Sequence, residues 1–196
     1  MPEDDSRITW LAAIPQYREI RDGELRWIIN QETTLDPATG DRHTRGTIRH
    51  PGVAVILPIL DDGRILMMRQ YRYAIDGELW ELPAGTMAGR EEGRLVTSEE
   101  TPEECAAREL EEETGWRAAR LVPLGEAFAM PGMTDERLHC FVARGLTRTR
   151  HDRDAGELIR EIRPMTEEEL RQMVAGNQIR DAKTLVALMF HWMRPR

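Results

Sequence analysis

The chain has 196 residues, with 35 acidic against 27 basic side chains and a formal net charge of −8. This length favours one domain, or one domain with an extension. The negative charge disfavours binding to nucleic-acid backbones. No apolar run is long enough to span a bilayer, so a membrane protein is not expected. The two cysteines stand far apart and the first residues are polar, which predicts a cytoplasmic protein.

Residues 1–50 form a predicted β-rich extension, followed by a main domain over residues 51–196. Two strand-like runs, at residues 25–29 and 44–49, flank a dense turn signal at residues 36–41. Turn residues between apolar runs are typical of a hairpin, so a small antiparallel sheet is expected here.

The main domain begins with a continuously apolar run at residues 53–57, which predicts a central strand. Further strands are predicted at residues 65–72, 79–82, 121–129, 138–143 and 159–162, and helices at residues 101–114, 166–174 and 183–193. The polar, glycine-bearing residues 86–99 predict a loop. Helices interspersed among strands predict an α/β class, or α+β with a mixed sheet.

The helix at residues 101–114 has clear start and stop signals. Thr101 can cap it, Pro102 suits the first helical position, and Glu104 completes a capping box. Gly115 can supply the left-handed residue that ends it.

The segment that contains most of this helix carries nearly all of the net charge. Residues 99–113 hold eight glutamates and one arginine, so the other residues sum to about −1. Glu109, Glu112 and Glu113 would share one helix face, although like charges four residues apart destabilise a helix. A solvated acidic face is one interpretation. The other is a hard, oxygen-only site for Mg²⁺ or Mn²⁺, which would relieve the repulsion.

The run Arg108-Glu109-Leu110-Glu111-Glu112-Glu113-Thr114-Gly115-Trp116 resembles the core of the Nudix box. Glu100, eight residues before Arg108, and Gly85 match the upstream positions of that box. The resemblance implies a Nudix-type α/β/α sandwich, here with an N-terminal antiparallel β extension. The family has five residues between the glycine and the first glutamate, whereas this chain has fourteen, which indicates a nine-residue insertion.

Nudix enzymes use Mg²⁺ to hydrolyse nucleoside diphosphates that are linked to another group. By resemblance, Glu109 and Glu113 become the principal metal ligands, and the carbonyl of Ala84 becomes a further ligand. Glu112 would bind a second metal or orient the water. Arg108 would hold a box glutamate in place, the alternative being a plain surface ion pair.

A second stretch resembles the ADP-ribose pyrophosphatase subgroup. Pro131 lies sixteen residues after Gly115, and the loop that follows it carries a candidate base or metal ligand at Glu136, with Asp135 the weaker alternative. Pro131, Gly132 and Met133 are then candidate substrate contacts. The alternative is an ordinary Pro-Gly turn.

Arg72 and Glu81 lie in two further segments that are similar to this subgroup. Arg72 would contact a diphosphate, since a guanidinium fork suits it, and Glu81 would face the ribose or the metals. The subgroup's N-terminal sheet often reaches across a two-fold dimer, which implies a homodimer here. Trp10 and Trp27 are then candidates to stack on adenine, unless they pack within a core or interface.

The expected reaction is Mg²⁺-dependent hydrolysis of ADP-ribose to AMP and ribose 5-phosphate. One alternative is the same chemistry on a sugar nucleotide such as GDP-mannose, or on a dinucleotide. A Nudix-fold sensor without catalysis is a third. The mutually repelling Glu109, Glu112 and Glu113 argue against this third reading.

Overall fold

The computed structural model describes residues 8–21, 23–149 and 158–194. The chain forms two compact units. The first unit contains the described residues up to Pro51 together with two later segments, Ala88–Glu99 and Met130–Glu136. The second unit contains Gly52–Met87, Glu100–Ala129 and the described residues from Arg137 onward.

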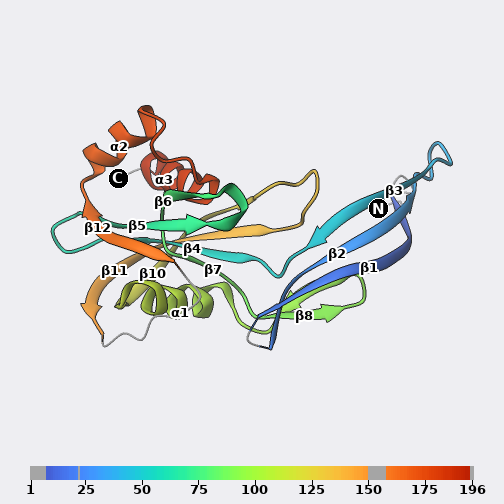
Figure 1. Ribbon diagram of the computed structural model, residues 1–196, viewed down its shortest axis with the longest axis horizontal. Coiled ribbons are helices and arrows are strands. Elements are labelled where there is room, and N and C mark those ends of the chain that lie inside the picture. The colour runs from blue at the N-terminus through green and yellow to red at the C-terminus, as the bar shows by residue number, and fades with distance from the viewer. Residues whose placement is uncertain (1–7, 22, 150–157, 195–196) are drawn as a thin grey trace, which may run out of the picture. The chain divides into compact units, whose positions relative to one another are not determined.

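The first unit is built on one antiparallel sheet (Figure 1). Its strands are β1 (Thr9–Arg21), β2 (Glu24–Leu35), β3 (Arg42–Arg49), β8 (Gly89–Glu92) and β9 (Leu95–Ser98). The predicted pairing of two strands around the turn at residues 36–41 is confirmed by β2 and β3. Strand β1 was not predicted, because register shifts such as the one between Trp10 and Ala12 interrupt the alternation of apolar residues.

The prediction of a loop over residues 86–99 is wrong, because β8 and β9 form an antiparallel hairpin there. Gly89 pairs with Leu25 of β2, so the inserted segment extends the N-terminal sheet. A Cβ atom at Gly89 would lie 2.3 Å from the carbonyl oxygen of Leu25, which explains the glycine. Strand β8 has no apolar side chain, and in β9 only Leu95 and Val96 are apolar and stand next to each other, so the hairpin lacks the apolar alternation by which strands are predicted.

The second unit has the mixed α/β organisation that the sequence predicts. Its strands are β4 (Val53–Pro58), β5 (Ile65–Arg72), β6 (Gly77–Glu81), β7 (Ala84–Thr86), β10 (Trp116–Phe128), β11 (Arg137–Arg148) and β12 (Ile159–Met165). Its helices are α1 (Pro102–Thr114), α2 (Glu167–Ala175) and α3 (Ala182–Met193), with a short 3-10 turn at Tyr73–Ile75. One sheet has the order β10-β11-β4-β7, with β11 and β4 parallel, and the other has the order β12-β5-β6.

Strand β4 is buried on both faces, which explains its continuous apolar run. Val53, Val55 and Leu57 enter one core, and Ala54 and Ile56 enter the other. Helix α3 packs on the first side and α1 on the second, so the two helices lie on opposite faces of this sheet (Figure 1). In the part of the chain that the structure describes, no helix is long and apolar enough to cross a membrane.

Helix α1 begins and ends where its signals predicted. The Thr101 hydroxyl accepts from the Glu104 amide, and the Glu104 carboxylate accepts from the Thr101 amide, so the capping box is complete. Gly115 adopts the left-handed conformation with φ of 70°. These caps fix the register of the helix, and with it the face on which Glu109 and Glu113 lie.

Candidate active site

The start of β7, at Ala84 and Gly85, receives two carboxylates from α1. Glu109 is 7% exposed and Glu113 is 2% exposed. The Ala84 amide donates to Glu113 Oε2 at 2.9 Å. A Cβ atom at Gly85 would lie 1.8 Å from Glu109 Cδ, so glycine is needed for this carboxylate to approach β7. The opening glycine of the box therefore has a steric reason.

Arg108 connects three carboxylates. Its Nε donates to Glu100 Oε1 at 2.9 Å, and its Nη1 donates to Glu109 Oε1 at 2.6 Å and to Glu112 Oε2 at 2.9 Å. Burial would lower the pKa of Arg108, but the hydrogen bond to Glu100 and the charge of Glu109 outweigh burial and raise it. Arg108 therefore does more than form a surface pair with Glu112, because it also ties the residue before the helix to the box.

The predicted metal ligands do not form a ready-made cluster. Among the described residues, no group of three His, Cys, Asp or Glu side chains is placed to hold a metal ion. Arg108 engages oxygens of Glu109 and Glu112, while Glu113 Oε2 faces the Ala84 amide. The donor set is nevertheless all oxygen and carries more carboxylates than cations. Its chemistry therefore fits a hard divalent cation.

A half-buried Arg72 and a buried Glu81 form an ion pair in the same unit. Arg72 Nε donates to Glu81 Oε1 at 2.8 Å and Nη2 donates to Oε2 at 2.6 Å, and Glu81 is fully buried. The hydrogen bond to Glu81 raises the pKa of Arg72 against the effect of burial, and the charge of Glu113 adds to the rise. The structure thus brings the predicted diphosphate contact into the field of the box carboxylate Glu113.

Sequence reasoning missed a second cation beside Glu81. Lys183 Nζ lies 3.6 Å from Glu81 Oε2 and 2.7 Å from Asp181 Oδ1. Asp181 caps α3. The hydroxyl of Thr184 in the first turn of α3 accepts from the Leu82 amide at 2.8 Å, which holds the end of β6 against the start of this helix. The available signal was composition, because Lys183 is the single lysine in this arginine-rich sequence.

The predicted loop residues Pro131, Gly132, Met133 and Glu136 belong to the first unit, where β3 holds their loop. The Ile48 amide donates to the Met133 carbonyl at 2.8 Å. Asp135 accepts from the His50 amide at 2.9 Å through Oδ1 and from Arg49 Nη1 at 3.0 Å through Oδ2. Both oxygens of Asp135 are therefore engaged in anchoring the loop that carries Glu136.

Arg49 is buried and joins this loop to β2. Its Nε donates to Glu32 Oε1 at 2.8 Å, its Nη2 contacts Glu32 Oε2, and Glu32 is 2% exposed. Burial alone would raise the pKa of Glu32, but the hydrogen bonds from Arg49 and Thr47 prevail and lower it. No motif pointed to this ion pair, although it fixes the end of β3.

The two candidate stacking residues contact side chains of their own sheet. The centroid of the Trp10 ring lies 3.9 Å from the guanidinium carbon of Arg94 and 5.1 Å from that of Arg49. The ring centroids of Trp27 and Tyr17 are 5.4 Å apart. These contacts favour the packing interpretation of both tryptophans over adenine stacking.

Known proteins that are similar to this chain include members of the family that the motif on α1 resembles. Residues 48–188 match the NUDIX domain family. An ADP-ribose pyrophosphatase from Bacillus subtilis (strain 168) is 33% identical over 77% of this chain and 77% of its own length. A GDP-mannose pyrophosphatase from Yersinia enterocolitica is 29% identical over 72% of this chain and 73% of its own. The crystal structure of an ADP compounds hydrolase shares the fold, with a TM-score of 0.75 at 19% identity, covering 95% of this chain and 94% of that one. The chain belongs to the Nudix family, and the prediction of a Nudix hydrolase is confirmed.

Proposed function

We propose that this Nudix hydrolase cleaves the pyrophosphate bond of ADP-ribose to give AMP and ribose 5-phosphate. The observation that carries the proposal is the Arg72–Glu81 pair, which stands in the field of the box carboxylate Glu113. A fixed guanidinium near the carboxylates of one helix suits a diphosphate that is bound together with a cation. Similarity to the Bacillus subtilis ADP-ribose pyrophosphatase supports the choice of substrate.

Mg²⁺ is the proposed cofactor, with Mn²⁺ as a substitute. Glu109, Glu113, Glu112 and the Ala84 carbonyl would hold it. When bound, it supplies charge neutralisation and an acidified water. Arg108 keeps Glu109 and Glu112 in place through its hydrogen bonds to both.

Glu136 is the proposed base or additional metal ligand from the loop after Pro131. Both oxygens of its neighbour Asp135 are engaged by Arg49 and the His50 amide, which argues against Asp135 in this role. Pro131, Gly132 and Met133 are the proposed substrate contacts of the same loop.

The test is a hydrolysis panel of ADP-ribose, GDP-mannose, NADH and diadenosine polyphosphates with Mg²⁺ and identification of the products. Glu112→Gln and Glu113→Gln should each lower kcat at least a hundredfold. Glu111→Gln is the matched control, because Glu111 lies on the same helix but pairs with Arg117 at 2.9 Å. Full activity in Glu113→Gln would contradict the proposed metal site.

GDP-mannose is the second candidate substrate, because the Yersinia relative carries that activity in its name. A higher kcat/KM for GDP-mannose, or for a dinucleotide, would replace ADP-ribose while keeping the chemistry. If none of these compounds is hydrolysed but one of them still binds, the result would favour a Nudix-fold sensor without catalysis.

A homodimer formed through the N-terminal sheet is also proposed. Strand β1 is an edge strand, and its exposed apolar side chains are Trp10, Leu11, Ile14, Tyr17 and Ile20. Such an edge invites association. Analytical ultracentrifugation should give a dimer for the native chain and a monomer for the double variant Ile14→Glu with Ile20→Glu. A native monomer would contradict the proposal.

A cytoplasmic location is also proposed. The free, buried Cys105 and Cys140 accord with it, because thiols stay reduced in that compartment.

A further inference from the structure

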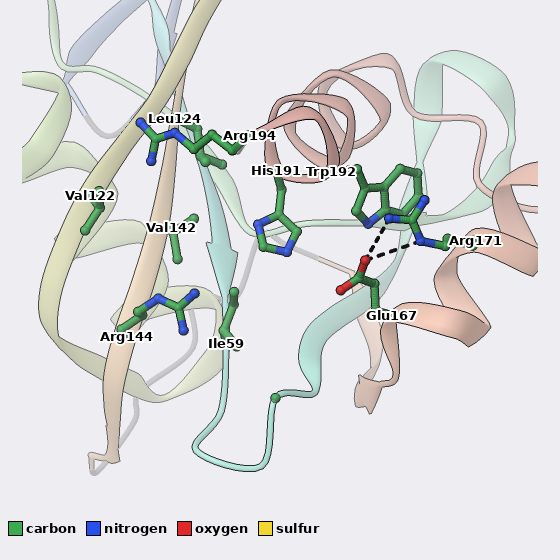
Figure 2. A pocket seen from close by; sticks show the side chains of 11 residues that line it. Ile59, Val122, Leu124, Val142, Arg144, Glu167, Arg171, His191, Trp192 and Arg194 are labelled. Atoms are coloured by element: carbon green, nitrogen blue, oxygen red, sulfur yellow. Dashed lines mark hydrogen bonds and ion pairs between the residues drawn. The ribbon is translucent and has the colours of Figure 1, made fainter. Parts of the chain in front are cut away.

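A cavity of about 460 Å³ lies in the second unit between the sheet and the C-terminal helices (Figure 2). Ile59, Val122, Leu124 and Val142 give it an apolar floor. These residues belong to, or pack against, the core on the α3 side of β4, whereas α1 packs on the opposite side. The cavity is therefore separate from the box carboxylates, and its volume is that of a small-molecule site.

Positive charge surrounds this apolar floor. Arg144 extends from β11, Arg171 from α2 and Arg194 from the end of α3, while Glu167 is the one acidic residue of the lining. Figure 2 shows Arg144 beside Val142 on one side, Arg171 and Trp192 on the other, and His191 between them. The lining has an excess of two positive charges in a chain whose net charge is −8.

The three arginines differ in how many of their side-chain donors are already hydrogen-bonded. Arg171 donates to Glu167 Oε1 at 2.7 Å and lies over the Trp192 ring at 4.3 Å. Arg194 Nη2 donates to the Pro123 carbonyl at 2.5 Å. Within residues 8–21, 23–149 and 158–194, Arg144 has neither an ion pair nor a hydrogen bond through its side chain. Arg144 is thus the cation with the most donors to offer a ligand.

Trp192 lines the cavity and carries an unsatisfied polar atom. Its indole Nε1 is buried and, among the described residues, has no hydrogen-bond acceptor. Buried donors are nearly always paired, so this N–H is a hydrogen-bonding capacity beside the cavity that the described residues leave unused.

We propose that this cavity binds a small organic anion, namely an aromatic or aliphatic body that carries one phosphate or carboxylate. The charged group is held by Arg144 and by the remaining donors of Arg194, since guanidinium groups suit both anions. The apolar body rests on Ile59, Val122 and Val142 beside Trp192. This site is independent of the proposed hydrolysis and shares no residue with it.

The test follows the Trp192 indole N–H of the full chain by ¹H–¹⁵N NMR, with the resonance assigned by its loss in Trp192→Phe. Phenyl phosphate and benzoate are titrated in EDTA, with inorganic phosphate and phenol as probes of the two halves of the ligand. Phenyl phosphate or benzoate should shift this resonance saturably, and whichever binds more tightly identifies the anionic group. Inorganic phosphate and phenol should each bind at least tenfold more weakly.

Arg144→Gln should weaken binding about tenfold, the loss expected for a charge-assisted hydrogen bond. Arg148→Gln is the matched control, because Arg148 lies on the same strand but contacts Trp116 and not the cavity. It should leave the affinity unchanged. The proposal is overturned if no probe moves the Trp192 resonance, if inorganic phosphate binds as tightly as phenyl phosphate, or if Arg144→Gln binds as the native chain does.

Discussion

Arg108 and Arg49 each stand at the centre of a group of carboxylates, but the two groups differ in the size of their negative excess. Arg108 serves Glu100, Glu109 and Glu112, so one positive charge faces three negative ones on or next to α1. Arg49 serves only Glu32 and Asp135, and both oxygens of each carboxylate are engaged, so this is a closed group. The larger excess can receive a cation, whereas the closed group fixes the loop at Met130–Glu136 to β2 and β3. We infer that the size of the negative excess, together with the engagement of the carboxylate oxygens, distinguishes a candidate metal site from a structural ion pair.

Among the variants that test this difference between the two groups, Gly85→Ala should have the largest effect, because it disturbs the α1 group without changing its charge. The new Cβ would overlap the Glu109 carboxylate and displace it from β7. We expect kcat to fall about a hundredfold, since misplacement of a site group by about 1 Å has that cost. Steady-state kinetics alongside a thermal melt would check this.

Gly46→Ala is the control for that variant, because a Cβ at Gly46 meets no atom within 4 Å. It should keep native kinetics. Native kinetics in Gly85→Ala would show that the position of Glu109 beside β7 is unimportant for catalysis.

Arg49→Met should break the closed group and cost about 3–5 kcal/mol of unfolding free energy, because it leaves the Glu32 charge buried without its partner. Urea denaturation would measure the loss. The double variant Glu32→Gln with Arg49→Met should recover part of it. Equal stability of native chain and single variant would show that this pair does not stabilise the fold.

Acid should weaken the contribution of the Arg49–Glu32 pair to stability. The folded-state pKa of Glu32 is lowered, so its contribution to stability is present above the ordinary carboxyl value of 4.5 and is lost as pH falls through the lowered value. The stability gap between the native chain and Arg49→Met should therefore narrow in acid. A gap that stays constant from neutral pH to about pH 3 would exclude this linkage.

Thr101→Ala gives the smallest expected effect. It removes the cap of α1 but leaves every box carboxylate, so we expect a loss of about 1 kcal/mol in unfolding free energy with kcat unchanged. Denaturant midpoints and initial rates would test both parts. A large fall in kcat would mean that the cap also positions the box.

The sequence predicted local features well and long-range ones poorly. The caps of α1 and the apolar run of β4 are signals within a few residues, and both were found where expected. Strands β8 and β9 show no alternation of apolar and polar residues, and the bulges of β1 disturbed the alternation there. Arg49 and Asp135 are 86 residues apart, so only the folded chain shows their pairing. Arg72 and Glu81 were predicted as site residues because their segments resemble a known subgroup. Lys183 lies in no such segment, so it was not predicted.

We have proposed that the α1 carboxylates hold a divalent cation for hydrolysis of ADP-ribose. The rate of AMP release from ADP-ribose, measured across a Mg²⁺ titration that begins in EDTA, tests this proposal. We predict no turnover in EDTA, a saturable rise with Mg²⁺, and equal amounts of AMP and ribose 5-phosphate. Turnover that is unaffected by EDTA, or intact ADP-ribose at saturating Mg²⁺, would contradict the account.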